Sequence, residues 1–450
     1  MQPTSRKRLL ILASKLGYQT SSFSAAAQKL GVEVIFATDR CHQLEDPWGD
    51  RAIPVHFERP QQAALDIVTA IHEAHEAPPD ALLALGDRPT VTAAYVAKAL
   101  VLEHNSPAVV EACRSKLRQR EIFRAAGLPV PPFFSFSIGE LPEIVATRAQ
   151  FPCVIKPLSL SASQGVIRAN SVPEFSTALT RIRRLLQSPE LQVTREPSLD
   201  RLLVEHYIPG SEVALEGLLD DGNLRILAIF DKPDPLEGPF FEETIYVTPS
   251  RLPLEIQHKI QHCAQDAVRA LGLIRGSVHA EFRINEQGPW ILEVAPRPIG
   301  GLCSHALRFG PFQNVETHET QEFISLEELL VRHALGLSGA DLPREQASSG
   351  VFMIPVPNSG VFEGVEGLDQ ARSTPGITEL HITARVHDYI AAWPEGASYL
   401  GFIFARGNDP AGVESSLRAA HSRLRFHLAE RLAVEHPALS QTKGASSGDH

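Results

Sequence analysis

The most informative stretch of the sequence is Val278–Arg297, which reads VHAEFRINEQGPWILEVAPR. Apolar residues alternate with polar ones up to Ile284 and again from Trp290, a pattern typical of two half-buried strands. The four residues that separate them, NEQG at 285–288, are ones that favour turns. The stretch therefore predicts a β-hairpin with one apolar face and one polar face.

The polar face of this hairpin carries two glutamates. A three-residue loop with Gly288 as its left-handed residue sets Glu281 directly across from Glu293, whereas a two-residue loop would spoil this register. Like charges that face each other on paired strands are unfavourable, unless a cation lies between them. Mg²⁺ takes carboxylate oxygens and is commonly held by one or two carboxylates plus substrate phosphates. We therefore predict a metal site at Glu281 and Glu293; the alternative is an ordinary hairpin with both glutamates in solvent.

Features that suit phosphate binding precede the hairpin in the chain. An apolar strand is expected over Phe151–Pro157, with Lys156 near its end, and the small residues SLSASQG follow at 159–165. Such a loop can bring backbone N–H groups close to phosphates. Upstream, a charged helix expected over Ser115–Ala126 supplies Lys116. The sequence contains neither a Walker pattern, GxxxxGK[ST], nor a dinucleotide fingerprint.

A strand–turn–strand pattern follows at residues 203–212, LVEHYIPGSE. Each of these segments is weak alone, because exposed lysines and glutamates are common. Their order is more specific: Lys116, then Lys156 with its small-residue loop, then Glu205, then the two hairpin glutamates and Arg297. In this order of motifs the chain resembles the ATP-grasp superfamily, and within it the L-amino-acid ligases.

The resemblance covers residues 108–309 and is densest at 293–301, EVAPRPIGG, which is similar to that family's Glu-x-Asn-x-Arg-x-x-Gly-Gly pattern. Two departures stand out. The position of the asparagine, a metal ligand in the family, is Ala295, which puts a second metal ion in doubt. The phosphate loop, which has several glycines in the family, keeps only Gly165, so we expect it to be less flexible.

The implied fold is α/β (α+β ATP-grasp). In the N-terminal part, strands expected at residues 8–13, 32–37 and 81–85 alternate with helices, which favours a parallel layer. After Pro132 the pattern changes to antiparallel strands. The predicted boundaries are an N-terminal parallel α/β domain at 1–107, a central ATP-grasp domain of two subdomains at 108–335, a small C-terminal α/β domain at 336–435, and a disordered tail at 436–450.

The resemblance also implies residue roles. Arg297 and Lys156 are the implied catalytic residues, because they would hold the transferred phosphoryl group. The phosphates of ATP would contact Lys116, Lys156, Ser163 and Gly165. Its adenine would contact Glu205, His206 and Ile208, and its ribose Glu212. Mg²⁺, or Mn²⁺ as the alternative, would bind Glu281 and Glu293. Residues 231–244 are a candidate lid, and His305 and Arg308 are candidates for lining the carboxylate pocket.

The implied activity is an ATP-dependent carboxylate–amine ligase that forms an amide or peptide bond through an acyl phosphate and releases ADP and phosphate. Its expected partners are small carboxylate and amine substrates, and amino acids are the preferred candidates for both. A homodimer is common in similar families. Two alternatives stay open. One is a purine-pathway or biotin-carboxylase-like enzyme that activates a small carboxylate or bicarbonate. The other is an ATP-binding regulatory protein without catalysis, which Ala295 favours.

Composition limits the other classes of function. The 450 residues carry a formal net charge of −11, which argues against a general nucleic-acid binder. The five cysteines are scattered without zinc-ligand spacing, which suggests reduced thiols. No window approaches the roughly 20 apolar residues of a membrane span, and the polar N-terminus does not resemble a signal peptide. We predict a cytoplasmic protein without membrane association.

Overall fold

The computed structural model describes residues 6–14, 19–39, 52–74, 77–196, 198–311 and 323–430. The tail predicted at 436–450 lies outside these ranges, as does Cys41. None of the helices in the described ranges combines the length and the apolar character that crossing a bilayer requires.

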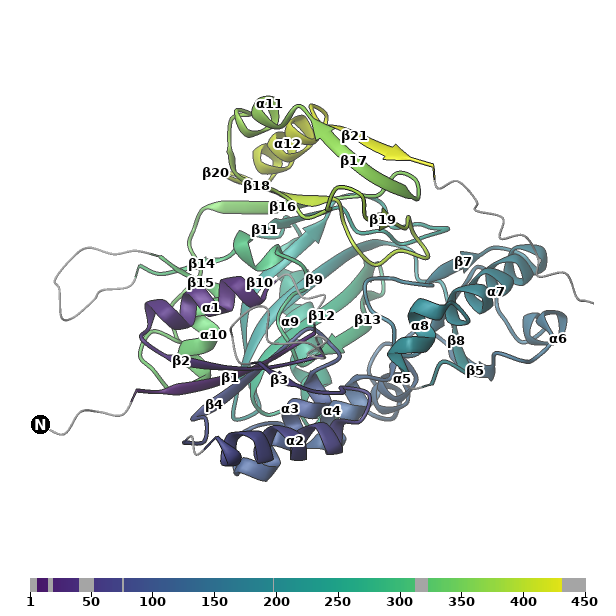
Figure 1. Ribbon diagram of the computed structural model, residues 1–450. Helices are drawn as coiled ribbons and strands as arrows, with labels where there is room; N and C mark the ends of the chain where they lie inside the picture. Colours follow the sequence, from purple (N-terminus) through teal and green to yellow (C-terminus); the bar gives the residue numbers. More distant parts are fainter. Residues whose placement is uncertain are drawn as a thin grey trace, which may run out of the picture.

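The N-terminal part is the predicted parallel layer (Figure 1). Its strands run in the order β3-β2-β1-β4 and all pair in parallel. All six residues of β1 are buried, as expected for a strand covered on both faces. The elements are β1 (Arg8–Ala13), α1 (Thr20–Lys29), β2 (Glu33–Thr38), β3 (Ile53–Pro54), α2 (Pro60–Glu73), β4 (Ala81–Leu85) and α3 (Thr90–Leu100).

A small antiparallel sheet follows, with the order β5-β8-β6-β7. Its strands are β5 (Phe133–Ser137), β6 (Cys153–Pro157), β7 (Ile167–Ala169) and β8 (Arg201–His206). Helix α7 (Val172–Leu186) covers one face, because its apolar stripe of Phe175, Leu179 and Ile182 packs into the same core as Ile155 of β6. The short helices α6 (Pro142–Ala146) and α8 (Pro189–Thr194) flank α7.

The largest element is an eight-stranded sheet with the order β13-β12-β9-β10-β11-β16-β20-β18. Three strands from the C-terminal third therefore extend the sheet that the central part begins. Helices α4 (Pro107–Cys113), α5 (Lys116–Ala125) and α9 (Leu254–Leu271) pack on one face of the half of the sheet that β13, β12, β9 and β10 form. The strands are β9 (Ser211–Asp220), β10 (Asn223–Lys232), β11 (Ile245–Thr248), β12 (Gly276–Asn285), β13 (Gly288–Ala295), β16 (Ser348–Ile354), β18 (Ile377–Ile382) and β20 (Gly401–Gly407).

The remaining C-terminal elements complete one end of the molecule (Figure 1). Helix α12 (Pro410–His421) packs on β16 and β20, and a three-stranded sheet has the order β19-β17-β21. These elements are β17 (Gly360–Glu366), α11 (Leu368–Arg372), β19 (Tyr389–Ile390), α12 and β21 (Arg425–Ala429). A 3₁₀ helix, η1 (Cys303–Ala306), the short pair β14 (Arg308–Phe309) and β15 (Ile324–Ser325), and helix α10 (Leu326–Ala334) connect the central and C-terminal parts.

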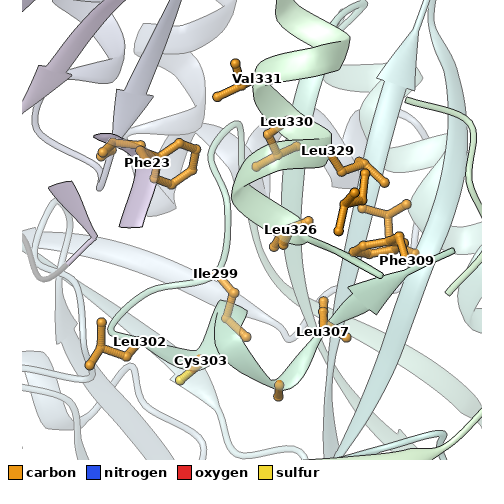
Figure 2. Packing of buried hydrophobic residues seen from close by; sticks show 14 of the residues in the cluster. Phe23, Ile299, Leu302, Cys303, Leu307, Phe309, Leu326, Leu329, Leu330 and Val331 are labelled. Atoms are coloured by element: carbon orange, nitrogen blue, oxygen red, sulfur yellow. The ribbon is translucent and has the colours of Figure 1, made fainter. Parts of the chain in front are cut away.

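One apolar cluster joins the N-terminal layer to the large sheet. Figure 2 shows Phe23 of α1 in the cluster that also holds Leu330 of α10 and Ile299, which follows β13. Phe402 and Phe404 of β20 belong to the same cluster. Burying each such side chain contributes roughly 1.5–3 kcal/mol. The N-terminal layer is therefore fixed against the segment that follows the carboxylate hairpin.

Candidate nucleotide and metal site

The hairpin β12–β13 has the predicted pairing of its glutamates but not the predicted turn. Glu281 lies opposite Glu293, as expected. However, Asn285 pairs with Gly288, so the turn has two residues, and Leu292 is an extra residue in β13. The bulge at Leu292 restores the register that a two-residue turn would otherwise shift, because a bulge sets two residues of one strand against one of the other.

The bulge also changes which residues of β13 face the core. Strict alternation from Trp290 would place Trp290, Leu292 and Val294 on one face, whereas the core contains Ile291 and Val294. The carbonyl of the bulged Leu292 accepts a hydrogen bond of 2.6 Å from Arg120 Nη2. A buried arginine of helix α5 thus holds the irregular point of the hairpin.

Helix α5 presents a mostly polar side to the interior, at i, i+3, i+4 and i+7: Lys116, Gln119, Arg120 and Phe123. The side chain of Gln119 acts as a sheet neighbour, since its Oε1 accepts from the N–H of Val294 at 2.9 Å and its Nε2 donates to the Val294 carbonyl at 3.1 Å. Helix α5 is therefore docked on the edge strand β13, which sequence patterning alone did not predict.

Glu205, predicted at the adenine, lies between two cations. Its Oε2 is 2.5 Å from Lys156 Nζ, and its Oε1 is 2.6 Å from Arg120 Nε. All three side chains are at least nine-tenths buried. Burial opposes the charge on Glu205, but Arg120 and Lys156 outweigh it, so the pKa of this carboxyl is lowered. Sequence reasoning missed Arg120, which looks like one more charge on a charged helix.

Lys116 connects the small-residue loop to the hairpin. Its Nζ donates to the Leu160 carbonyl at 2.8 Å and lies 3.3 Å from Glu293 Oε2. The backbone N–H of Lys116 also donates to the Leu158 carbonyl at 3.0 Å. The structure therefore brings together a predicted phosphate-binding lysine and a predicted metal ligand.

Lys232, at the end of β10, is a site residue that sequence reasoning missed. Its Nζ lies 2.7 Å from Glu212 Oε1 and 3.1 Å from Glu281 Oε1, and it also pairs with Glu243. We had assigned residues 231 and 232 to the lid loop. The signal was nonetheless present, because Lys232 lies directly across from Glu212 in the β9–β10 hairpin and so shares its face.

The carboxylates of this cluster outnumber its cation. Glu212, Glu243 and Glu281 offer oxygen atoms that all lie within 4.8 Å of one another. Burial, together with the two neighbouring carboxylates, raises the pKa of Glu243 to about 7 in spite of Lys232. Hard oxygen donors at this separation suit a cation such as Mg²⁺.

His279 lies on the same face of β12 and links Glu281 to a second buried carboxylate. Its Nδ1 is 2.5 Å from Glu216 Oε1, and its Nε2 is 3.5 Å from Glu281 Oε1. Burial disfavours the charged ring, but Glu216 outweighs it and raises the pKa of His279 to about 9. Ala295, at the position of the family's asparagine, pairs with His279 in the sheet and offers no ligand atom.

Arg297 reaches the N-terminal layer. Its Nε lies 2.9 Å from Oδ1 of Asp87, and its Nη1 donates to the Pro298 carbonyl at 2.9 Å. Burial opposes the charge on Asp87, but Arg297 outweighs it and lowers the pKa of Asp87 to about 2. Sequence reasoning missed Asp87. It follows β4 closely, at the carboxyl end of a parallel sheet, where ligand-binding residues commonly gather.

The small-residue loop is held by the C-terminal part of the chain. Trp393 Nε1 donates to the Ala162 carbonyl at 3.0 Å, and the N–H of Gly165, one of the predicted phosphate donors, donates to the Pro394 carbonyl at 2.8 Å. Ala162 and Ser163 have φ of 53° and 54°, in the left-handed region that residues with a side chain rarely adopt. The surrounding contacts must stabilise this conformation.

The hinge, residues 205–208 at the end of β8, links the small antiparallel sheet to the large sheet. Ile208 and Glu212 both contact Arg283 of β12, whose Nη1 donates to the Ile208 carbonyl at 3.2 Å and whose Nε lies 3.2 Å from Glu212 Oε2. His206, also predicted at the adenine, is at the end of β8, and its Nδ1 lies 3.4 Å from the Gln150 carbonyl. Of the two candidates for the carboxylate pocket, Arg308 is exposed, and His305 contacts the C-terminal strand β18 instead.

Three models of known protein families match segments of this chain. The model of the ATP-grasp domain matches residues 149–306, which include the small-residue loop, the hinge and the hairpin. The chain belongs to the ATP-grasp superfamily. Two further models match the flanking parts: the ATP-grasp N-terminal domain at residues 23–103 and the L-amino acid ligase C-terminal domain 2 at residues 352–429. The ATP-grasp fold predicted from the motifs, and the resemblance to L-amino-acid ligases, are thus confirmed.

Individual relatives share this superfamily. A D-alanine–D-alanine ligase of Geotalea uraniireducens is 32% identical over 190 residues, which are 41% of this chain and 56% of that protein. The alanine–anticapsin ligase of Bacillus subtilis is 25% identical over 300 residues, 62% of each chain. The matches thus span less than two thirds of these relatives' lengths. The crystal structure of an L-amino acid ligase from Bacillus licheniformis superposes with a TM-score of 0.78 at 25% identity, covering 94% of this chain and 99% of that one.

Proposed function

We propose that this ATP-grasp protein is an ADP-forming carboxylate–amine ligase that joins amino acids. The observation that carries the proposal is the polar face of β9, β10, β12 and β13, where carboxylates converge beside Lys232 and where Glu293 meets Lys116. The matches to the L-amino acid ligase C-terminal domain and to a solved L-amino acid ligase favour amino acids as the substrates.

The residues of this face fit Mg²⁺. When Glu212, Glu243 and Glu281 are all ionised, the Lys232 ammonium and the Arg283 guanidinium that pairs with Glu212 leave one negative charge, which a bound cation would offset. Lys232 already lies within 3.1 Å of two of these carboxylates, which indicates that the group attracts cations. We propose Glu281 and Glu293 as the metal ligands, where bound Mg²⁺ would neutralise phosphate charge.

The nucleotide would lie between the hinge and the small-residue loop. Lys116 and Lys156 would meet its phosphates together with Ser163, whereas the N–H of Gly165 is already used by the Pro394 carbonyl, so Gly165 would only shape the loop. Glu205 holds Lys156 in place through the 2.5 Å ion pair. Because an ionised carboxylate has about four acceptor sites, it still has capacity for the adenine amino group. The backbone of His206 and Ile208 would complete the adenine site, and Glu212 would meet the ribose.

The chemistry follows from the charges. A carboxylate is a poor acyl donor, so its oxygen first takes the terminal phosphoryl group of ATP, and ADP leaves. Lys156 and Arg297 would stabilise the negative charge that spreads over the phosphoryl oxygens in this step. The amine nitrogen then attacks the carbonyl carbon, and phosphate leaves as the amide forms. Asp87 holds the Arg297 guanidinium, so we assign it a positioning role.

The first test is the release of ADP by the purified protein with Mg-ATP and pooled amino acids. We expect ADP and phosphate to appear only when a carboxylate and an amine are both present, and to vanish in Glu293→Ala. Glu286→Ala, at the exposed turn of the same hairpin, is the matched control and should keep its activity. ADP release that needs bicarbonate but no amine would support the carboxylase-like alternative. Nucleotide binding without turnover across the pool would support a regulatory protein.

A further inference from the structure

A second cluster of ligand-type side chains shares no residue with the carboxylate face. It consists of His305 in η1 and of Glu379 and His381 in β18. Glu379 and His381 lie on β18, the edge strand at the opposite end of the large sheet from β13, and His305 lies on η1, which follows the hairpin. The cluster therefore does not belong to the candidate nucleotide site, and the proposed reaction does not use it.

The three side chains converge on one point. Glu379 Oε2 is 3.2 Å from His305 Nδ1 and 3.0 Å from His381 Nε2, and all three ligand atoms lie within 4.8 Å of one another. Glu379 and His381 share one face of β18 because they are two residues apart. A tetrahedral metal with bonds of about 2.0–2.1 Å holds its ligand atoms roughly 3.3 Å apart. Two of the three separations are thus already close to those of a metal site.

The orientation of His305 is fixed by its surroundings. Its other ring nitrogen, Nε2, lies 3.0 Å from the Ser22 hydroxyl of α1. Its ring stacks on Phe404 with centroids 5.4 Å apart, and its carbonyl accepts from Arg406 at 3.1 Å. Histidines that bind metals usually donate their second N–H to such a polar partner, which selects the tautomer whose free nitrogen faces the metal.

The cluster is accessible from a cavity. His305, Glu379 and Ser22 line a cavity of about 420 Å³ between α1, η1 and β18. The side chains of His305, Glu379 and His381 are 22%, 36% and 46% exposed, so an ion can enter and keep a water ligand. The cavity is lined by charges of both signs, Glu327 and Glu328 beside Lys29 and Arg308, and Glu328 pairs with Lys29 at 3.1 Å.

We propose that His305, Glu379 and His381 form a site for a divalent transition-metal ion, with Zn²⁺ as the best fit. Two imidazole nitrogens and one carboxylate oxygen are the donors that Zn²⁺ takes, and a solvent-facing fourth position suits a water molecule. The bound ion would tie η1, which follows the carboxylate hairpin, to the C-terminal strand β18. Its role is a cross-link between the central and C-terminal parts of the chain.

The test is Zn²⁺ binding to the full-length protein without nucleotide, measured by calorimetry in excess Mg²⁺, which competes for the carboxylate face. We expect one equivalent to bind. His381→Ala should weaken binding by at least about 100-fold, since it removes a ligand, and Ser22→Ala by about 10-fold. His258→Ala, which changes an exposed histidine of α9, is the matched control and should bind as the parent does.

Diffraction at the zinc edge from soaked crystals gives the independent readout. A single anomalous peak within bonding distance of His305 Nδ1, Glu379 and His381 Nε2 would support the site. Absence of Zn²⁺ binding in excess Mg²⁺, or equal binding by His381→Ala with an unchanged circular dichroism spectrum, would overturn it. Neither result depends on ligase activity, so failure of this site and failure of the proposed function are distinguishable.

Discussion

The hairpin β12–β13 and the small-residue loop at 159–165 both meet Lys116, but different contacts hold them. Strand pairing sets Glu281 against Glu293, so neighbours in the same sheet fix the hairpin face. The loop takes its conformation from Trp393 and Pro394, more than 200 residues later in the chain. Strand register therefore determines the positions of the candidate metal ligands, whereas packing against the C-terminal part determines the conformation of the candidate phosphate loop.

The largest expected effect comes from breaking the hairpin face without changing its register. Glu281→Gln removes a charge that we assign to metal binding, so the turnover number should fall roughly 100-fold to 1,000-fold. The measurement is steady-state ADP release across Mg²⁺ concentrations, alongside Glu286→Gln at the turn. If both variants kept full activity, the hairpin face would not be the metal site.

The support beneath the hairpin can be broken separately. Arg120→Met removes the buried guanidinium that meets Glu205 and the bulged carbonyl of Leu292. The loss of one buried charge partner should lower the free energy of unfolding by about 3 kcal/mol. Denaturant unfolding measures it, with Arg118→Met on the exposed side of the same helix as the matched control. Equal stability of the two variants would contradict the role of Arg120.

The ion pair between Asp87 and Arg297 joins the N-terminal layer to the hairpin. Asp87→Asn should cost about 2 kcal/mol of stability at neutral pH, because the pKa of Asp87 is about 2 in the folded protein and about 3.8 when unfolded. A carboxyl whose pKa is lowered on folding stabilises the folded protein at pH values above its pKa in the unfolded chain. The deficit of the variant should therefore be complete above pH 4 and shrink as the pH falls towards 2.

Thermal unfolding across that pH range measures the deficit. The control is Asp369→Asn, whose side chain is 97% exposed. A deficit that stayed the same at all pH values would mean that the ionised carboxylate is not what Arg297 needs.

The smallest expected effect concerns the loop. Trp393→Phe removes the N–H that meets the Ala162 carbonyl, a loss of about 1 kcal/mol. If the C-terminal part shapes the phosphate cradle, the KM for ATP should rise about fivefold while the turnover number changes little. Trp290→Phe, which removes an indole N–H at the hairpin turn instead, is the matched control. An unchanged KM in Trp393→Phe would separate the loop from its C-terminal contact.

Sequence patterns correctly predicted the strands and the strand pairing that depend on residues close together in the chain. The strands β1 and β4 begin and end at the residues predicted for them from short apolar runs, and the predicted parallel layer was correct. The pairing of Glu281 with Glu293 was also correct, although the two-residue turn and the bulge at Leu292 were not. Turn and bulge compensate each other, so the periodicity of one strand cannot reveal either of them alone.

The missed residues depend on contacts between distant parts of the chain. Asp87 is 210 positions from Arg297, and the contact forms only because the N-terminal layer packs against the segment after β13. In the sequence Arg120 resembles a surface charge, because nothing near it in the chain indicates that α5 packs on the edge strand β13. Lys232 was the most predictable of these, since it lies across a tight hairpin from Glu212.

The central claim is that a carboxylate is activated as an acyl phosphate on the hairpin face. The most direct measurement uses an amino acid labelled with ¹⁸O in its carboxylate, chosen from the pooled assay, followed by analysis of the released phosphate. We expect one ¹⁸O atom in the phosphate for each amide formed, because the attacking carboxylate oxygen leaves with the phosphoryl group. Label in AMP, or unlabelled phosphate beside a formed amide, would contradict it.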